Sequence, residues 1–349
     1  MRVISPQKKT AIILFNLGGP DHPDAVRPFL KNLFFDPAII RLFRPLRWGI
    51  AELISRKRAP TAQKIYEELG GKSPILENTV AQAGALENTL RQHGDVRVFT
   101  VMRYWHPRAH DVARDVKNYA PDDIILLPLY PQYSTTTTAS SFKEWHSAAA
   151  KAGLKNTPTH AVCCYPTQQD FIRAHAQLVR TYFDEASHHG TPRILFSAHG
   201  LPEKIVKKGD PYQWQVEQTT REIVRELGSQ PDHVNCYQSR VGPMKWIGPA
   251  TDDEILRAAV EKKPVVLVPV AFVSEHSETL VELDIEYAEL AHKNGLDRYY
   301  RVPTLSVHAQ FIAGLAEMCL KIENGSARCA SHTGARICPR SFNQCGATA

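Results

Sequence analysis

The sequence has no hydrophobic run long enough to cross a membrane. It has 349 residues, 43% of them hydrophobic, and its first apolar run, AIILF at 11–15, is only five residues long. A transmembrane helix needs about 20 consecutive apolar residues, and a signal peptide needs a longer apolar core with a cleavage site. We therefore expect a cytoplasmic protein without a spanning helix.

The usual nucleotide-binding fingerprints are also missing. The motif NLGGP at 16–20 lacks the GxGxxG of dinucleotide-binding folds, and no phosphate loop of the GxxxxGKS type is present. Its glycines turn the chain or let the backbone approach a flat ligand. The net charge of +6 is spread along the chain without a basic and aromatic platform, so we expect no nucleic-acid partner.

Apolar runs bounded by turn residues alternate with longer segments of helical period. Nearly continuous hydrophobicity is typical of strands buried on both faces of a parallel sheet. The predicted strands are 11–19, 96–104, 123–130, 160–166, 193–200 and 265–273, and the predicted helices are 60–69, 75–93, 107–118, 141–152, 168–187, 212–227 and 276–292. This alternation predicts an α/β fold with doubly wound parallel sheets.

The length is typical of about two domains. The strands divide evenly around residue 155, which predicts an N-terminal lobe at 1–155 and a C-terminal lobe at 156–325. Residues 326–349 have neither helical nor strand periodicity and are expected to form a cysteine-bearing tail. Ligands of such folds bind beyond the carboxyl ends of the strands, so residues that directly follow strands are the candidate site residues.

His199 is the first such candidate. It ends the run RILFSAH in the motif SAHGLP, and the Gly-Leu-Pro break after it keeps the histidine outside a following helix. An imidazole with a pKa near 6.5 is suited to accept a proton near neutral pH. The alternative is a histidine with a purely structural role.

An acidic row follows the strand at 265–273. If the stretch EHSETLVELDIEYAEL winds as an α-helix, five glutamates share one stripe, namely Glu275, Glu278, Glu282, Glu286 and Glu289. Like charges four residues apart destabilise a helix by roughly 0.2–0.5 kcal/mol per pair. Helix capping and a solvated face form one explanation. The other is a cavity-facing row that binds a hard cation or passes protons.

Two further segments have two interpretations each. The hydroxyl-rich loop at 129–142, LYPQYSTTTTASSF, is either a helix-capping run or a set of donors that line the crevice. The segment 38–58 is either an ordinary amphipathic helix or a basic, aromatic lip. Such a lip would touch a membrane surface or admit an apolar ligand that carries carboxylates.

Together these motifs resemble the ferrochelatase family, whose members insert ferrous iron into a porphyrin to make haem. The matching stretches span nearly the whole chain: NLGGP, APTAQKIYEELGGKSPI, MRYWHP, YPQYSTTTT, SAHGLP, YQSRVGPMKWIGP (237–249) and FVSEHSETLVELDIEY (272–287). The resemblance implies two Rossmann-like lobes with the macrocycle in the cleft between them. It also implies a lyase-type chelatase whose substrates are protoporphyrin IX and Fe²⁺.

The resemblance assigns roles to the candidate residues. His199 would lie at the pyrrole nitrogens as proton acceptor or metal-delivering ligand, with Glu278 across the cleft and His276 in support. Glu282 and Glu286 would continue the line outward as a conduit for the metal or for protons. Whether Glu275 and Glu289 belong to that line stays open.

The resemblance also predicts the porphyrin pocket and its mouth. Leu14, Arg103 and Tyr104 would line the pocket, and Arg58 would pair with a propionate at the lip. Segment 41–58 matches the apolar lip of the family. This match implies a transient contact with a membrane surface. We therefore expect a cytoplasmic protein that can also bind peripherally at the inner face of the membrane.

Seven cysteines are an odd number, and a cytosolic setting argues against structural disulfides. Cys329, Cys338 and Cys345 resemble the C-terminal thiolates of ferrochelatases that carry a [2Fe–2S] cluster, which needs four such ligands. The fourth would be Cys163 or Cys164, and only one of these adjacent strand residues can face the cluster. Zinc binding and unpaired surface thiols are the alternatives.

Two rival functions stay open at this point. One is a chelatase for coproporphyrin III, a porphyrin that differs from protoporphyrin IX in the number of carboxylates that the pocket must hold. The other is a non-catalytic porphyrin-binding or redox-sensing protein. The presence of both His199 and Glu278 argues against the second rival, because a carrier needs neither.

Overall fold

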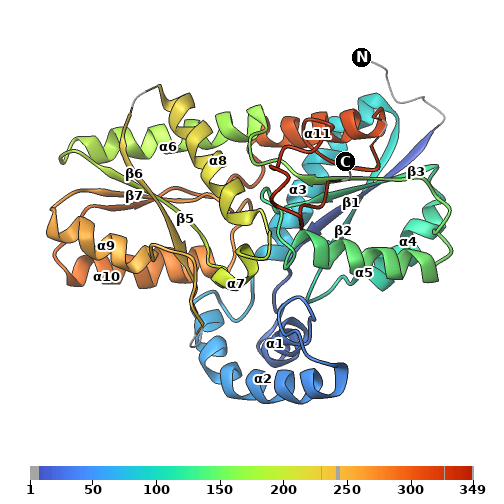
Figure 1. The fold of residues 1–349 in the computed structure, drawn as a ribbon, viewed down its shortest axis with the longest axis horizontal. Helices are drawn as coiled ribbons and strands as arrows, with labels where there is room; N and C mark the ends of the chain where they lie inside the picture. The colour runs from blue at the N-terminus through green and yellow to red at the C-terminus, as the bar shows by residue number, and fades with distance from the viewer. Residues whose placement is uncertain (1–7, 229, 241–243, 326, 348–349) are drawn as a thin grey trace.

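The computed structural model describes residues 8–347 except 229, 241–243 and 326. Two parallel sheets lie side by side, and a pair of helices projects beneath them (Figure 1). The strand order is β2-β1-β3-β4-β9 in the first sheet and β6-β5-β7-β8 in the second. Helices connect the strands, so the predicted α/β fold with parallel sheets is confirmed.

All six predicted runs form strands, and three further strands were not predicted. The first sheet contains β1 (Lys9–Asn16), β2 (Asp95–Met102), β3 (Asp123–Pro128), β4 (Thr159–Cys164) and β9 (Cys329–Ser331). The second contains β5 (Arg193–His199), β6 (Asp232–Gln238), β7 (Val265–Pro269) and β8 (Tyr299–Arg301). The sequence of β6, DHVNCYQ, mixes polar with apolar residues, and β8 and β9 are only three residues long. None of the three therefore has the apolar run that marks a buried strand.

The helices connect these strands and cover the sheets. The α-helices are α1 (Val26–Phe34), α2 (Arg44–Glu67), α3 (Ile75–Leu90), α4 (Ala109–Tyr119), α5 (Thr138–Lys151), α6 (Gln169–Ser187), α7 (Glu203–Val206), α8 (Tyr212–Leu227), α9 (Thr251–Val260), α10 (Tyr287–Lys293) and α11 (Ala309–Glu323). A π-helix spans Glu278–Glu286, and short 3₁₀ turns span Pro23–Ala25 and Arg91–His93.

Alternate residues of each strand pack on opposite faces of the sheet. In β1, Ile12 and Leu14 pack with α3, whereas Ile13 and Phe15 pack with α4 and α5. The cluster that contains Ile12 extends through α6 and α11 to β5 and β7. The two sheets therefore share one continuous apolar core, and the residues at their strand ends are held in fixed relative positions.

The chain does not divide at residue 155 as expected. β4 pairs with β3 and so belongs to the first sheet, and the chain leaves that sheet only after Cys164. The tail also contains regular structure, because β9 pairs with β4 and completes the first sheet. The sequence did not reveal this pairing, because it depends on backbone hydrogen bonds to a distant strand and needs little side-chain pattern.

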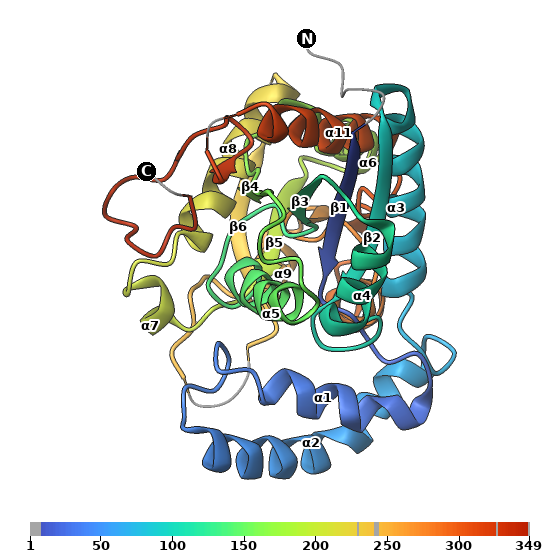
Figure 2. The same cartoon turned by 90° about the vertical axis from the view of Figure 1, so that its right-hand side faces the viewer.

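Helices α1 and α2 form an arm beneath both sheets (Figure 2). The predicted lip (residues 41–58) lies largely on α2, which begins at Arg44 with Pro45 in its first turn. The side chains of Phe43, Trp48 and Leu53 are exposed. Within the described part of the chain, no helix has both the length and the apolar character that crossing a bilayer requires.

The glycines of NLGGP have a packing explanation. Gly18 turns the chain after β1 with φ of +83°, and a Cβ there would lie 3.0 Å from the Cβ of Met102. A Cβ on Gly19 would lie 2.5 Å from the Cβ of Ser73. Both positions are too crowded for a side chain, which favours the structural interpretation of the motif.

Candidate functional site

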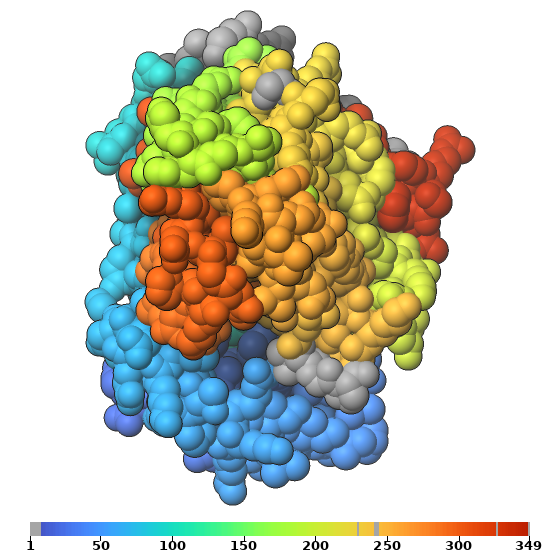
Figure 3. Space-filling view, turned by 90° about the vertical axis from the view of Figure 1, so that its left-hand side faces the viewer, coloured from blue at the N-terminus to red at the C-terminus, as the bar shows by residue number. Residues whose placement is uncertain are grey.

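Three of the predicted site residues meet at the carboxyl ends of β5 and β7. His199 is the last residue of β5, and the segment after β7 carries His276 and Glu278. The Nε2 atom of His199 lies 3.9 Å from Oε1 of Glu278, and Nε2 of His276 lies 3.8 Å from its Oε2. Figure 3 shows the surface hollowed between the blue arm that carries α2 and the orange part of the C-terminal lobe.

Backbone carbonyls fix the tautomers of both histidines. Nδ1 of His199 lies 2.7 Å from the carbonyl oxygen of Gly200, and Nδ1 of His276 lies 3.0 Å from that of Ser274. A carbonyl oxygen only accepts, so each Nδ1 carries the hydrogen and each Nε2 faces Glu278. The His199 side chain is 40% exposed, whereas that of His276 is 8% exposed. Only His199 is therefore open to a ligand from solvent.

Charges around Glu278 separate the pKa values in this group. Burial works to raise the pKa of Glu278, but the charges of His199 and His276 lower it to about 2. Burial likewise works to lower the pKa of His276, and the Glu278 carboxylate raises it above its usual value. Near neutral pH Glu278 is thus an anion, and its charge favours the protonated form of buried His276.

Glu282 is held by hydrogen bonds from two elements. It accepts from the backbone N–H of Ser239 at 3.0 Å, from Nε2 of Gln238 at 3.0 Å and from the hydroxyl of Tyr287 at 3.1 Å. The hydroxyl of Ser239 donates to the same carboxylate at 2.5 Å. Burial and the nearby Glu278 charge nevertheless raise the pKa of Glu282. Of the two neighbouring carboxylates, Glu282 is therefore the better proton acceptor.

The five glutamates do not form a single α-helical stripe. Residues 278–286 wind as a π-helix, in which the N–H of Tyr287 donates to the carbonyl of Glu282 five residues earlier. Glu275 pairs with Arg301, and Glu289 pairs with Lys293 at the exposed end. The α-helical geometry assumed from the sequence is thus corrected, because π-winding shifts residues four apart off a common line.

The network around Asp36 engages two of the predicted pocket residues. Arg103 donates to Asp36 at 2.8 Å, to Ser140 at 2.9 Å and to Glu144 at 3.1 Å, and the Tyr104 hydroxyl donates to Asp36 at 2.8 Å. The Asp36 side chain is 1% exposed. Arg103 therefore joins the segment between α1 and α2 to α5, and each of its guanidinium nitrogens already has a protein partner.

The other predicted pocket residues lie in contrasting environments. Leu14 and Tyr104 are 0% and 1% exposed, so a porphyrin could contact them only after surrounding side chains move. Arg58 is exposed on α2, with its guanidinium carbon 5.9 Å from the ring centre of Phe34. Glu286 is exposed beyond Glu282, at the outer end of the acidic row.

The hydroxyl-rich loop joins the two lobes. Buried Asp210 accepts hydrogen bonds from the hydroxyl of Ser134 at 3.0 Å and from the N–H of Thr135 at 2.7 Å. It also accepts from the N–H of Tyr212 at the start of α8. These contacts favour the structural interpretation of that loop.

Five cysteines gather where β4 meets β9 and the tail. Cys163 lies 3.6 Å from Cys164 and shares a hydrogen bond with Cys329, which raises the pKa of the Cys329 thiol. A hydrogen bond from Cys338 lowers the pKa of Cys345 to about 6. Among the described residues, no three His, Cys, Asp or Glu side chains already stand in a metal-binding arrangement.

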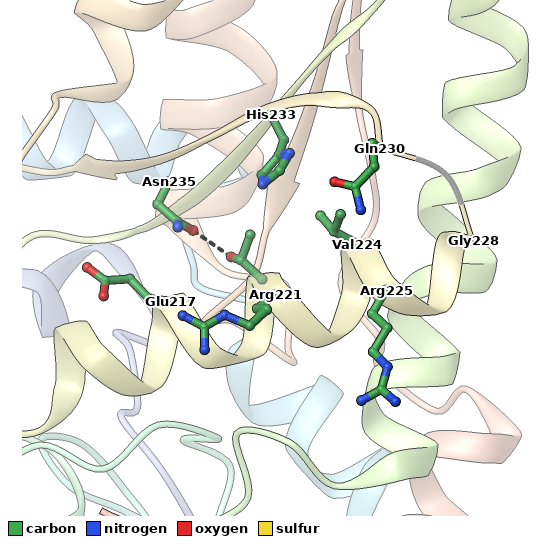
Figure 4. Close-up of a pocket in the computed structure, with 9 residues that line it drawn as sticks. Glu217, Arg221, Val224, Arg225, Gly228, Gln230, His233 and Asn235 are labelled. Atoms are coloured by element: carbon green, nitrogen blue, oxygen red, sulfur yellow. Dashed lines mark hydrogen bonds between the residues drawn. The ribbon is translucent and has the colours of Figure 1, made fainter. Parts of the chain in front are cut away.

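A separate cavity of about 780 Å³ lies between α8 and β6 (Figure 4). Its lining includes Arg221, Arg225 and His233, and none of the described residues around it is a predicted site residue. It adjoins the first residues of β6, at the opposite end of the sheet from His199. Since ligands of this fold class bind at the carboxyl ends, the site with His199 is the better candidate.

Sequence reasoning missed several residues that hold the site together. Gln238 and Ser239 belong to the motif at 237–249 but received no role, because the preceding strand β6 was not recognised. Residues 241–243 of that motif lie outside the described residues. Tyr287 and Arg301 had no local signal, because their partners are known only from the tertiary structure.

Comparisons with known proteins agree with this geometry. The family model described as Ferrochelatase matches residues 9–322. The chain is 50% identical over 341 residues to a ferrochelatase of Pelagibacter ubique (97% of this chain, 98% of that one). It is 54% identical over 317 residues to one of a Wolbachia species from Drosophila simulans (90% and 99%).

The solved structures give the same fold at low sequence identity. The chain is similar to SirB from Bacillus subtilis with Fe³⁺, with a TM-score of 0.52 at 10% identity over 91% of this chain and 96% of that one. It is also similar to the sirohydrochlorin chelatase SirB of the subspecies spizizenii with cobalt, with a TM-score of 0.53 at 8% identity (91% and 97%). At such identities the likeness concerns the fold alone.

Replacing Glu278 with glutamine should lower the pKa of His276, because the carboxylate that stabilises its imidazolium is removed. The folded-state pKa of His276 lies above 6.5, so this attraction stabilises the fold fully below pH 6.5 and is lost as the pH rises through the raised value. NMR titration of histidine ring signals measures the pKa. Urea unfolding between pH 5 and 9 measures the matching loss of stability.

Glu286→Gln is the matched control. Glu286 is exposed at the outer end of the row, so its removal should leave both the His276 titration and the stability profile unchanged. An unaltered His276 pKa in Glu278→Gln would contradict the ion-pair assignment.

Proposed function

Because the chain belongs to the ferrochelatase family, we propose that it inserts Fe²⁺ into protoporphyrin IX, the terminal step of haem biosynthesis. The products are protohaem and two protons. The observation that carries this proposal is the group of His199, Glu278 and His276 at the carboxyl ends of β5 and β7. Its members combine an accessible imidazole with a carboxylate that stays ionised.

Metal insertion requires that both pyrrole N–H protons leave while Fe²⁺ loses its water. In its neutral form His199 presents the lone pair of Nε2, because its Nδ1 hydrogen is directed to the carbonyl of Gly200. It is therefore the proton acceptor for the pyrrole nitrogens, which it deprotonates one after the other, passing each proton to the acidic row. Glu278 stabilises the imidazolium that forms, and its negative charge attracts the incoming cation. His276 holds Glu278 in place from the buried side.

The acidic row carries protons outward in this proposal. Glu278 and Glu282 have pKa values displaced in opposite directions, which is the arrangement that lets one carboxylate stay charged while its neighbour accepts a proton. The oxygens of Glu282 already accept hydrogen bonds from Ser239 and Gln238, which leaves it poorly placed to replace the water of a metal ion. Exposed Glu286 completes the path to solvent.

A [2Fe–2S] cluster bound by Cys163, Cys329, Cys338 and Cys345 is a second part of the proposal. The donor chemistry fits, because four thiols lie together and Cys345 has a pKa of about 6 that favours its thiolate form. Cys163 is preferred over Cys164, because the Cys163 thiol shares a hydrogen bond with Cys329. Ligation requires the two thiol pairs to shift towards one another.

A transient contact between the lip and a membrane surface is the third part. Phe43 and Leu53 are each 68% exposed, and Trp48 is 53% exposed on the same segment. Exposure of such side chains to water is unfavourable, and removal of each one from water is favourable by about 1.5–3 kcal/mol of free energy. Arginines at 41, 44 and 47 surround them and suit an anionic lipid surface.

Replacing His199 with alanine should lower the rate of iron insertion by about 10²–10⁴-fold, which is the usual contribution of a general base. Porphyrin binding should be largely retained. Anaerobic loss of protoporphyrin fluorescence on addition of Fe²⁺ measures turnover, and fluorescence titration measures binding.

Two further experiments distinguish the rival functions, namely a coproporphyrin III chelatase and a non-catalytic porphyrin carrier. Side-by-side turnover with coproporphyrin III identifies the preferred porphyrin. Wild-type protein that binds porphyrin without metal insertion would support the carrier function instead.

Glu282→Gln should slow turnover while the KM for Fe²⁺ stays within about threefold of the wild-type value. A large rise in that KM would assign Glu282 to metal transport.

The cluster ligand is tested by two adjacent serine variants. Cys163→Ser should abolish the visible absorption and the iron and sulfide content of anaerobically purified protein, because a thiolate ligand is lost. Cys164→Ser is equally buried and should keep both signals. The reverse pattern would make Cys164 the ligand, and absence of iron and sulfide from the wild type would remove the cluster from the proposal.

The lip is tested by sedimentation with vesicles that contain phosphatidylglycerol. Phe43→Ser with Leu53→Ser should reduce binding at least tenfold, because the apolar area available for insertion is lost. Val260→Ser removes an even more exposed apolar side chain, at the end of α9, and should have no effect. Equal losses in both variants would mean that the binding is not located at the lip.

A further inference from the structure

Arg301 lies beside the acidic helix and contacts one acid just before the helix and one within it. It is the last residue of β8, an edge strand of the second sheet, and its side chain is 11% exposed. Nη1 donates to Glu275 at 2.6 Å, and Nε donates to Asp284 at 2.6 Å. Nη2 also donates to Asp284, so all three guanidinium nitrogens are engaged.

These two acids bracket the residues that perform the proposed chemistry. Glu275 precedes His276 and Glu278, and Asp284 follows Glu282. Glu275 also accepts from the N–H of Thr304 at 2.9 Å, which fixes its position against the loop after β8. Arg301 thus attaches the start and the middle of the reacting segment to one rigid strand.

The winding of the helix is consistent with this bridge. Glu275 and Asp284 are nine residues apart, and nine residues of α-helix rise about 13.5 Å, a long span for one guanidinium to bridge. Residues 278–286 have i→i+5 bonds, which widen the helix and shorten its rise per residue. The guanidinium fork accepts a carboxylate only in a narrow range of geometries, so the two hydrogen bonds to Asp284 hold that residue at a defined place beside β8.

We propose that Arg301 is a positioning residue for iron insertion, which holds the π-helix in the register that places Glu278 between His199 and His276. It touches neither substrate. Its removal would leave Glu275 and Asp284 without a cationic partner and would weaken the attachment of the segment to β8. This proposal rests on the proposed function, since it concerns the same site.

The matched control lies two residues earlier on the same strand. The hydroxyl of Tyr299 donates to the carbonyl of Leu283 at 2.7 Å, so it also joins β8 to the π-helix. Tyr299→Phe removes that uncharged link and leaves the Arg301 bridge intact. Comparison of the two positions separates the specific bridge from a general loosening of the contact.

The experiment compares Arg301→Gln, Arg301→Lys, Asp284→Asn and Tyr299→Phe at a temperature where each is folded by circular dichroism. Arg301→Gln should lower kcat for iron insertion at least tenfold, while the Kd for protoporphyrin IX stays within twofold. Arg301→Lys should recover part of kcat, because its ammonium reaches one carboxylate. Tyr299→Phe should stay within twofold of the wild type.

Asp284→Asn keeps the pairing between Arg301 and Glu275 and should show a smaller fall in kcat with unchanged porphyrin binding. It tests the same bridge if Arg301→Gln does not fold. Hydrogen exchange of residues 278–286, measured by mass spectrometry, gives a readout that does not depend on activity. It should accelerate in Arg301→Gln more than in Tyr299→Phe.

Three outcomes would overturn the proposal: kcat retained within twofold in Arg301→Gln, porphyrin Kd weakened as much as kcat falls, or an equal loss in Tyr299→Phe. Iron insertion by the wild type tests the proposed function independently of the role of Arg301. If the wild type inserts no iron, equal exchange rates in Arg301→Gln and the wild type would overturn the bridge on its own terms.

Discussion

Buried hydrogen bonds between the two lobes fix the segment on which the site depends. Gln82 of α3 is fully buried, donates to the carbonyl of Val273 at 2.8 Å and accepts from the hydroxyl of Ser274 at 2.7 Å. Asn16, at the end of β1, donates to the same hydroxyl at 3.1 Å. An unpaired buried polar group costs about 1–3 kcal/mol. Residues of β1 and α3 therefore hold the segment after β7 that carries His276.

The crowded acids of residues 275–289 are tolerated because each has a different neighbour. Glu278 lies between two histidines, Glu282 accepts four hydrogen bonds, and Glu275 pairs with an arginine from another strand. Their mutual repulsion is thus offset locally, and the charge that stays available is concentrated at Glu278. The cost of repulsion expected for an isolated helix in water is therefore an overestimate for these glutamates, because it leaves out their partners from other elements.

The sequence predicted what depends on local pattern. Long apolar runs identified the buried strands, and His199 and Glu278 followed from their places after those runs. The half-exposed strand β6 lacks such a run, so the partners of Glu282 at Gln238 and Ser239 were missed. The π-winding and the role of Arg301 were also beyond reach. The nine residues 278–286 have a pattern that fits an α-helix or a π-helix, and the contacts from β8 distinguish the two windings.

The pairing of β9 with β4 has a consequence for how the chain is made. Cys329 lies opposite Ala161, and Ser331 opposite Cys164, so the last strand to leave the ribosome completes the surroundings of an early one. A nascent chain that stops before β9 would expose β4 as an unpaired edge, a template for aggregation. The cysteine site can therefore assemble only after the chain has been synthesised through Cys345, so any group bound there would distinguish chains that reach this residue from shorter ones.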